Sequence, residues 1–162
     1  MLEQEIASAI KFLVEASGNP TPYYYSVPQD FLVPAVHFPP PEVVSGGDTL
    51  HTYSLGYSLF VKFFHRTTEE AYALGLAALT ALQGRKNVIP LIDENGLPTG
   101  RGFRAKDPSL KPLDHAAQLT LMWDSPRPYE VGQHQKMMTF DANFYSKAAH
   151  GRAVGQIIET EG

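Results

Sequence analysis

Apolar and polar residues alternate along the stretch TYSLGYSLFVKFF, which runs from Thr52 to Phe64. One side of this pattern is entirely apolar or aromatic, and the other side is largely polar or small. Such a strand buries one face, whereas strands of parallel sheets, which are buried on both faces, lack the alternation. The pattern therefore predicts an antiparallel sheet with a strand over about residues 50–65, whose buried face is formed by Tyr53, Leu55, Tyr57, Leu59, Val61 and Phe63.

Further strands are predicted nearer the C-terminus. Residues 88–104 are typical of a hairpin around the Asn95-Gly96 turn, and residues 106–113 are interpreted as a loop. The stretch HAAQLTLMWD at residues 115–124 alternates again, so it is expected to pair with the strand at 50–65 or to lie near it. Its apolar side consists of Ala117, Leu119, Leu121 and Trp123.

Two helices are predicted. Apolar residues recur at helical spacing over residues 2–16, and Gly18 follows as a stop signal. The second helix begins after a capping-box pattern of Thr67 and Glu70, runs through AYALGLAALTAL and ends at Gly84. Because this second helix is apolar nearly all round, we expect it to be buried on more than one side, against the sheet and against either the first helix or another subunit.

A proline-rich segment, PTPYYYSVPQDFLVPAVHFPPP, fills residues 20–41. Its seven prolines prevent a central strand throughout, because proline has no backbone N–H to donate to a sheet. Two interpretations stay open: an extended segment packed on its own domain with residues 31–38 as an edge strand, or an arm that docks on a neighbouring subunit. A glycine-rich loop is expected at residues 45–47.

Together these elements predict an α+β fold, with a mainly antiparallel sheet packed against two helices and a long proline-rich extended segment. A chain of 162 residues is long enough to form one domain with its own core. We expect a single domain over residues 1–145 and a C-terminal extension over residues 146–162, which is mobile or ordered by a partner.

Composition narrows the classes of function that the chain can have. The formal net charge is -4 and the basic residues are scattered, which argues against specific nucleic-acid binding. The absence of cysteine excludes disulfides, a thiolate nucleophile and a cysteine-based zinc site. The N-terminus lacks the pattern of a signal peptide, and no apolar run is long enough for a membrane helix, so a soluble protein without a membrane partner is expected.

No motif of catalysis or cofactor binding emerges. The six histidines lack metal-ligand spacing, and Asp93 with Glu94 stands beside a turn signal, where acidic residues are common. The Gly-x-Gly at residues 100–102 does not open a helix, as a dinucleotide site requires. We therefore expect no catalytic residue, no cofactor and no metal. A small metal-dependent hydrolase or nuclease stays open as the alternative of a different class.

The order of elements resembles the tail terminator, or tail completion, proteins of long-tailed bacteriophages and phage-derived contractile particles. The resemblance covers roughly residues 2–145 and is carried by YSLGYSLFVKFF with its capped helix AYALGLAALTAL, by NVIPLIDENG, by FRAKDPSLKP and by AQLTLMWD. The long aromatic segment at residues 20–41 and the extended C-terminus depart from the family.

The resemblance implies a structural role and no enzymatic one. Such proteins form a ring, usually of six subunits, that caps the completed tail tube and offers a surface to the neck or collar. The implied partners are further copies and tail tube, sheath or neck proteins, with DNA passing through the lumen. The implied location is the host cytoplasm during assembly and then the virion or phage-like particle. A head-tail connector or other neck component is the alternative within this class.

Ring formation through heterologous contacts requires two different complementary patches on each subunit. The aromatic segment, the apolar second helix and unpaired strand edges are the candidates. The subunit interface is accordingly expected to include Tyr24, Phe31, Val33, Leu76, Leu79, Phe140, Phe144 and Tyr145.

Overall fold

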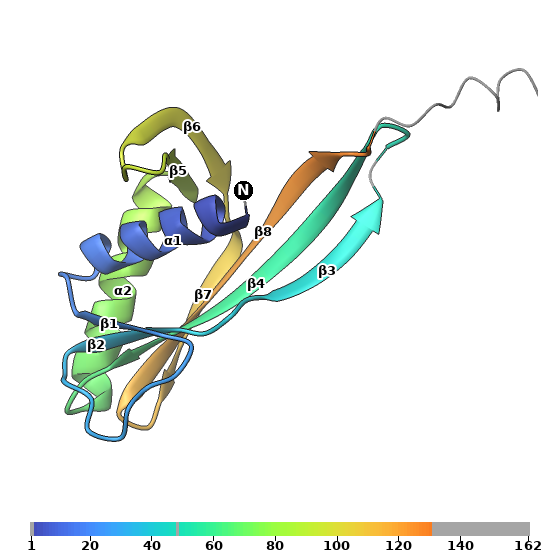
Figure 1. Ribbon diagram of the computed structural model, residues 1–162. Helices are drawn as coiled ribbons and strands as arrows, with labels where there is room; N and C mark the ends of the chain where they lie inside the picture. Colours follow the sequence, from blue (N-terminus) through green and yellow to red (C-terminus); the bar gives the residue numbers. More distant parts are fainter. Residues whose placement is uncertain (1, 48, 131–162) are drawn as a thin grey trace, which may run out of the picture. The chain divides into compact units, whose positions relative to one another are not determined.

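The computed structural model describes residues 2–47 and 49–130, and the chain up to Arg127 forms one compact unit (Figure 1). The elements follow each other as α1 (Leu2–Ala16), β1 (Thr21–Tyr24), β2 (Ala35–Phe38), β3 (Glu42–Gly47), β4 (Thr52–Phe64), α2 (Thr68–Gly84), β5 (Val88–Ile92), β6 (Pro98–Arg104), β7 (Lys106–Leu113) and β8 (Ala116–Pro128). This arrangement confirms the predicted α+β class. The predicted bounds of domain and extension stay predictions, and residues 140–145 lie outside the described residues.

The main sheet has the strand order β1-β2-β4-β8-β7, and β3 pairs with β4 on the same edge as β2. β1 runs parallel to β2, whereas β2 and β3 are antiparallel to β4, and β7 is antiparallel to β8. β5 and β6 form a separate antiparallel hairpin, as predicted. The sheet is therefore mainly antiparallel, and the expected neighbourhood of β4 and β8 is confirmed.

The core lies on the face of the sheet that the alternating pattern predicted. Tyr57, Leu59, Val61 and Phe63 of β4 are buried, and so are the four apolar residues predicted for β8. One continuous core joins these strands to Ala9 and Leu13 of α1 and to Ala78 and Leu82 of α2, so both helices cover this face. β4, β8 and β3 continue beyond the helices as a three-stranded ribbon (Figure 1).

Hydrogen bonds fix α1 to the β5–β6 hairpin. The Gln4 side-chain amide donates to the Ile92 carbonyl over 2.8 Å, and the Ile92 backbone N–H donates to the Ser8 hydroxyl over 3.0 Å. Ser8 is almost fully buried, so this partner satisfies a hydroxyl that would otherwise be costly to bury. The helix is thus positioned by polar contacts at one side and by the core at the other.

The capping box of α2 forms as predicted. The Thr67 hydroxyl oxygen accepts from the Glu70 backbone N–H over 3.2 Å, and the hydroxyl donates to the Glu70 carboxylate over 3.2 Å. α2 packs against the sheet and against α1, two of the neighbours predicted for it. Ala71, Gly75, Ala78 and Leu82 are buried on one face, because α1 and the sheet join the same core, whereas the opposite face is exposed.

Three expectations about strands were wrong. The edge strand predicted at residues 31–38 is the shorter β2, which lies inside the sheet because β1 covers its outer side. The loop predicted at residues 45–47 belongs to β3, where β4 supplies the pairing partner. The loop predicted at residues 106–113 is β7, whose prolines are tolerated because this strand is at the sheet edge and pairs on one side only.

Candidate assembly surfaces

Two of the residues considered for chemistry, Asp93 and His115, lie in turns. The Asp93 carboxylate accepts from the backbone N–H groups of Asn95 and Leu97, over 2.8 and 2.9 Å, which closes the β5–β6 turn. The His115 ring is 2.8 Å from the Arg66 carbonyl in the turn before β8. Within residues 2–47 and 49–130 there is no group of three or more metal-ligating side chains. No helix in that part of the chain is long and apolar enough to cross a membrane.

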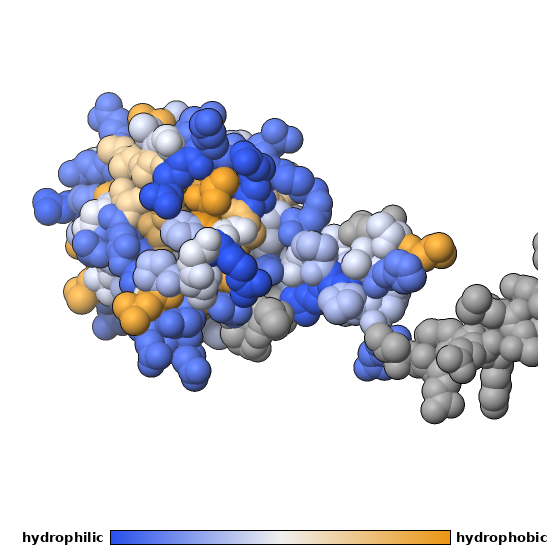
Figure 2. All heavy atoms as spheres, turned by 90° about the horizontal axis from the view of Figure 1, so that it is seen from above, coloured by the Kyte–Doolittle hydropathy of each residue, from blue (hydrophilic) through white to orange (hydrophobic). Residues whose placement is uncertain are grey.

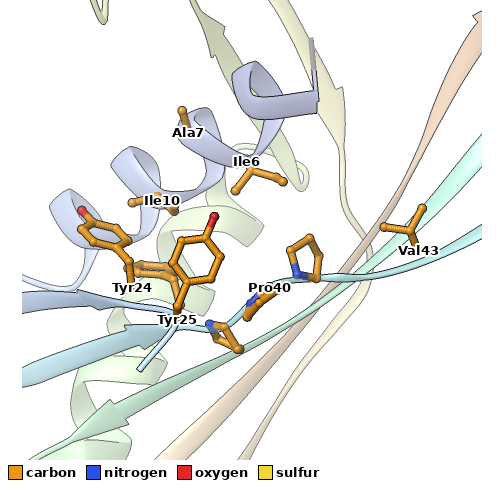
Figure 3. A pocket seen from close by; sticks show the side chains of 10 residues that line it. Ile6, Ala7, Ile10, Tyr24, Tyr25, Pro40 and Val43 are labelled. Atoms are coloured by element: carbon orange, nitrogen blue, oxygen red, sulfur yellow. The ribbon is translucent and has the colours of Figure 1, made fainter. Parts of the chain in front are cut away.

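An apolar groove of about 430 Å³ runs between α1 and the start of β3 (Figure 3), and we call it the α1–β3 groove. Figure 3 shows Ile6 and Ile10 of α1 on one wall, Tyr24 and Tyr25 on another, and Pro40 and Val43 where the chain enters β3. The lining is Ile6, Ala7, Ile10, Tyr24, Tyr25, Phe38, Pro39, Pro40, Pro41 and Val43. Its size falls in the range of ligand pockets, and its walls select apolar side chains.

A shallower hollow continues from the groove over the outer side of α1 and β1, and we call it the α1–β1 hollow. Tyr24 separates the two, with its ring stacked on Phe38 at a centroid distance of 6.2 Å and half of its surface exposed. The rim carries charge, because Lys11 and Glu15 form an exposed ion pair of 3.7 Å. The hollow is lined by Ala7, Ile10, Lys11, Val14, Glu15, Asn19, Pro22 and Tyr24.

The exposed face of α2 forms a third apolar surface, the α2 face. Leu76 lies at the centre of this face and is 47% exposed, although the leucines of an amphipathic helix usually face the core. A shallow depression beside it is lined by Thr68, Glu69, Tyr72, Ala73, Leu76 and Pro112, the last of these from β7. Figure 2 shows that apolar side chains on the face seen from above likewise gather within a mostly hydrophilic surface.

A polar network holds α1 against the base of the ribbon. The Glu5 carboxylate accepts from the Trp123 indole N–H over 2.7 Å and from the Ser125 hydroxyl over 2.8 Å. Arg127 donates to the Ser125 hydroxyl over 3.3 Å and to the Tyr57 hydroxyl over 3.4 Å. Tyr57 also stacks on Trp123, with ring centroids 5.1 Å apart.

The pKa of Tyr57 is raised above its usual value of 10.0. Burial is the main cause, because the phenolate loses hydration, and the negative charge of Glu5 adds to the effect while Arg127 opposes it. The network is therefore a structural anchor built from the start of α1 and the middle of two strands.

The structure spreads the predicted interface residues over different places. Tyr24 lines the groove and the hollow, and Leu76 stands on the α2 face. Phe31 packs within the chain, 5.0 Å from the Phe64 ring, and Leu79 packs against the core. Val33 is 39% exposed. The remaining candidates, Phe140, Phe144 and Tyr145, lie outside the described residues.

Sequence reasoning missed the α1 walls of the groove and the tip of the ribbon. Ile6 and Ile10 pack against the core but are only partly buried, whereas Ala9 and Leu13 of the same helix are fully buried. The available signal for these walls was the width of the apolar stripe on the helix at residues 2–16, which includes Val14. Leu50, which is 92% exposed, had no signal, because a single leucine in a turn is unremarkable by pattern.

The chain is therefore an α+β protein whose notable features are apolar surfaces, and comparison with known proteins gives its family. No protein-family model matches the chain. It is 35% identical over 129 residues to the uncharacterized protein YqbJ of Bacillus subtilis strain 168, which covers 80% of this chain and 88% of that protein. The chain belongs to the family of YqbJ.

A second relative adds the biological setting. The chain is 29% identical over 143 residues to the phage-like element PBSX protein XkdJ of the same strain, which covers 88% of this chain and 97% of that protein. The alignment spans nearly all of both proteins, so the two share more than one segment. The chain is accordingly a phage-related protein.

Proposed function

We propose that the protein is a structural subunit that assembles into a ring and terminates the tail of a phage or phage-like particle. Its similarity to a protein of the phage-like element PBSX over almost the whole chain supports a role in a phage-derived assembly. The resemblance of its element order to tail terminators supports the end of the tail as the place of action. Its polar side chains act as turn and anchor residues, which fits a structural role.

The positions of two apolar surfaces on the chain support the proposed ring. The α1–β1 hollow lies at the β1 edge of the main sheet, and the α2 face lies beside β7, which is the opposite edge. The two surfaces share no residue. Copies placed side by side, each in the same orientation, therefore bring an α2 face against the hollow of the next copy. Such a contact is heterologous, and it generates a ring when the rotation between copies closes.

The chemistry of the two surfaces is complementary. Leu76 stands out from the α2 face, and Val14 and Tyr24 line the hollow that would receive it. At the rims, the negative Glu69 of one copy would face Lys11 of the next. Burying each large apolar side chain stabilises the contact by about 2 kcal/mol. Six such contacts in a closed ring would reinforce one another, since no contact can open without strain on its neighbours.

The partners follow from the ring. One face would bind the end of the tail tube or sheath, the other face would bind a neck protein, and DNA would pass through the lumen. A chain with a net charge of -4 fits that passage, because a surface of the same sign as DNA does not retain it. The protein would assemble in the host cytoplasm and remain in the finished particle.

Electron microscopy and mass photometry of the purified full chain test the proposal. We expect rings with a central hole and a mass close to six subunits, or to twelve where two rings are joined. Leu76→Glu should convert the rings to smaller species while the far-UV circular dichroism spectrum is unchanged. Leu97→Glu is the matched control, because Leu97 is similarly exposed but belongs to the β5–β6 turn, outside both surfaces. A wild-type chain that stays monomeric at high concentration would overturn the proposal.

A further inference from the structure

The open edge of β3 differs from every other strand edge in the described chain. The outermost strands β1 and β7 contain Pro22 or Pro108 and Pro112, and the free end of β8 contains Pro126 and Pro128. Both strands of the β5–β6 hairpin also contain a proline. Proline cannot donate a backbone hydrogen bond, and it is a common means of blocking unwanted strand pairing. β3, with the sequence EVVSGG, has no such protection.

β3 is also exposed along its whole length. All six residues are exposed, including Val43 and Val44, which are 48% and 72% exposed. β3 pairs with β4 on one side, and its backbone groups on the other side have no partner among the described residues. Val44 lies opposite Gly56, so no side chain of β4 covers it. An edge that is exposed along its whole length and contains no proline is a template for another strand.

We propose that β3 pairs antiparallel with β3 of a second copy, so that the two ribbons join into one continuous sheet. Such a contact is isologous, because the same edge is used on both copies. Residues directly opposite each other point to the same face, so each residue of β3 can lie opposite its equivalent in the second copy. We assign the register with Val44 opposite Val44, because Val44 is the more exposed of the two valines and lies opposite Gly56, which leaves its side chain uncovered.

The same register gives Leu50 a partner. Leu50 lies at the turn between β3 and β4 and is 92% exposed, the largest exposed fraction among the large apolar side chains of the described chain. When Val44 is opposite Val44, Gly47 at the end of β3 is level with Pro41 of the second copy, so the tip that carries Leu50 lies toward the prolines that precede β3. Phe38 and the prolines after it line the α1–β3 groove, so each tip can place its leucine at the groove of the other copy. Strand pairing supplies the hydrogen bonds, and the groove supplies the selectivity.

A second copy is the occupant that the observations favour. An antiparallel match needs two edges with free N–H and C=O groups, and β3 itself is the edge that offers both without interruption by proline. The edge, the exposed leucine and the groove all belong to one chain, so the complete contact requires no other sequence. Each copy gives and receives the same side chains, which makes the surface self-complementary.

This contact is independent of the ring contact. The ring contact uses the α2 face and the α1–β1 hollow, whereas the pair uses β3, Leu50 and the Pro40 end of the groove. Isologous contacts close on two copies, while heterologous contacts propagate. A chain with both contacts forms even-numbered assemblies, such as two rings joined through their ribbons.

Single-cysteine variants test the pair, since the natural chain contains no cysteine. Residues directly opposite each other in antiparallel strands are close enough for a disulfide. In the Leu76→Glu background, which removes the ring contact, we expect Val44→Cys to form a disulfide-linked dimer at least tenfold faster than Leu97→Cys in a glutathione buffer. Ser45→Cys should be slower than Val44→Cys, because in this register each Ser45 lies opposite Val43 of the other copy, and the two Ser45 positions are diagonal neighbours about 7–8 Å apart.

A second variant tests the pair without a disulfide. Leu50→Ser in the same background should raise the dissociation constant of the dimer at least tenfold, as measured by analytical ultracentrifugation, with circular dichroism verifying the fold. Equal oxidation rates of Val44→Cys and Leu97→Cys, or an unchanged dissociation constant for Leu50→Ser, would overturn the pair. Failure of the ring would show separately, as wild-type protein that is dimeric and no larger.

Discussion

Replacing Glu5 by Ala tests the anchor of α1 most directly. Trp123 is fully buried, and its indole N–H donates to Glu5 over 2.7 Å. Without that acceptor, a buried donor is left unpaired, which costs about 2 kcal/mol. The buried Ser125 hydroxyl loses a bond to a charged group but keeps its contact with Arg127, which costs about 1 kcal/mol more. The expected loss in the free energy of unfolding is therefore about 3 kcal/mol.

Urea unfolding followed by far-UV circular dichroism at one fixed protein concentration measures this loss. In a chain of this length, 3 kcal/mol corresponds to a fall of about 9 °C in the melting temperature. Glu5→Gln should lose only about 1 kcal/mol, because its amide oxygen still accepts from the indole. Glu15→Ala on the same helix is the control, since its ion pair with Lys11 is exposed and contributes little. A loss below 1 kcal/mol for Glu5→Ala would refute the reasoning.

Two further predictions concern Tyr57 and Gly75. Because burial raises the pKa of Tyr57, an absorbance titration at alkaline pH should show its phenol ionising at a higher pH in the folded chain than in the unfolded chain. As the pH rises, the phenol of Tyr57 loses its proton in the unfolded chain before it does so in the folded chain. The stability that Tyr57 contributes is therefore complete below pH 10 and declines as the pH rises further. A stability independent of pH in that range would contradict this. A Cβ at Gly75 would lie 2.5 Å from a methyl carbon of Leu110. Gly75→Val should therefore lower the free energy of unfolding by about 2 kcal/mol, and Leu110→Ala in the same chain should recover part of the loss; additive effects of the two would exclude the clash.

The sequence allowed the fold to be predicted wherever one face of an element is buried. The alternation in Thr52–Phe64 identified β4 and its core face, and the pair Thr67 and Glu70 located the start of α2, because both signals are local. The class α+β follows from these elements. The pairing of strands in the sheet was not predicted correctly. β7 was interpreted as a loop, and its two prolines are acceptable only because the strand lies at a sheet edge.

The candidate surfaces were predictable only in part, for a related reason. The exposed position of Leu76 follows from an α2 that is apolar on every side, but the partial burial of Phe31 depends on its contact with Phe64, a residue far along the chain. The groove is built by three segments that meet in the folded chain, α1, the end of β1 and the prolines before β3. No window of sequence contains all three, so no periodicity could reveal it.

The single long strand β4 has a mechanical consequence. Its second half is held in the core, and its first half belongs to the ribbon, without a break in the backbone between them. A displacement of the ribbon tip would therefore be transmitted along β4 to Tyr57, which stacks on Trp123, the only tryptophan of the chain. The fluorescence of Trp123 should thus report contacts of the ribbon, because a neighbour that twists the tip would change the emission wavelength or intensity.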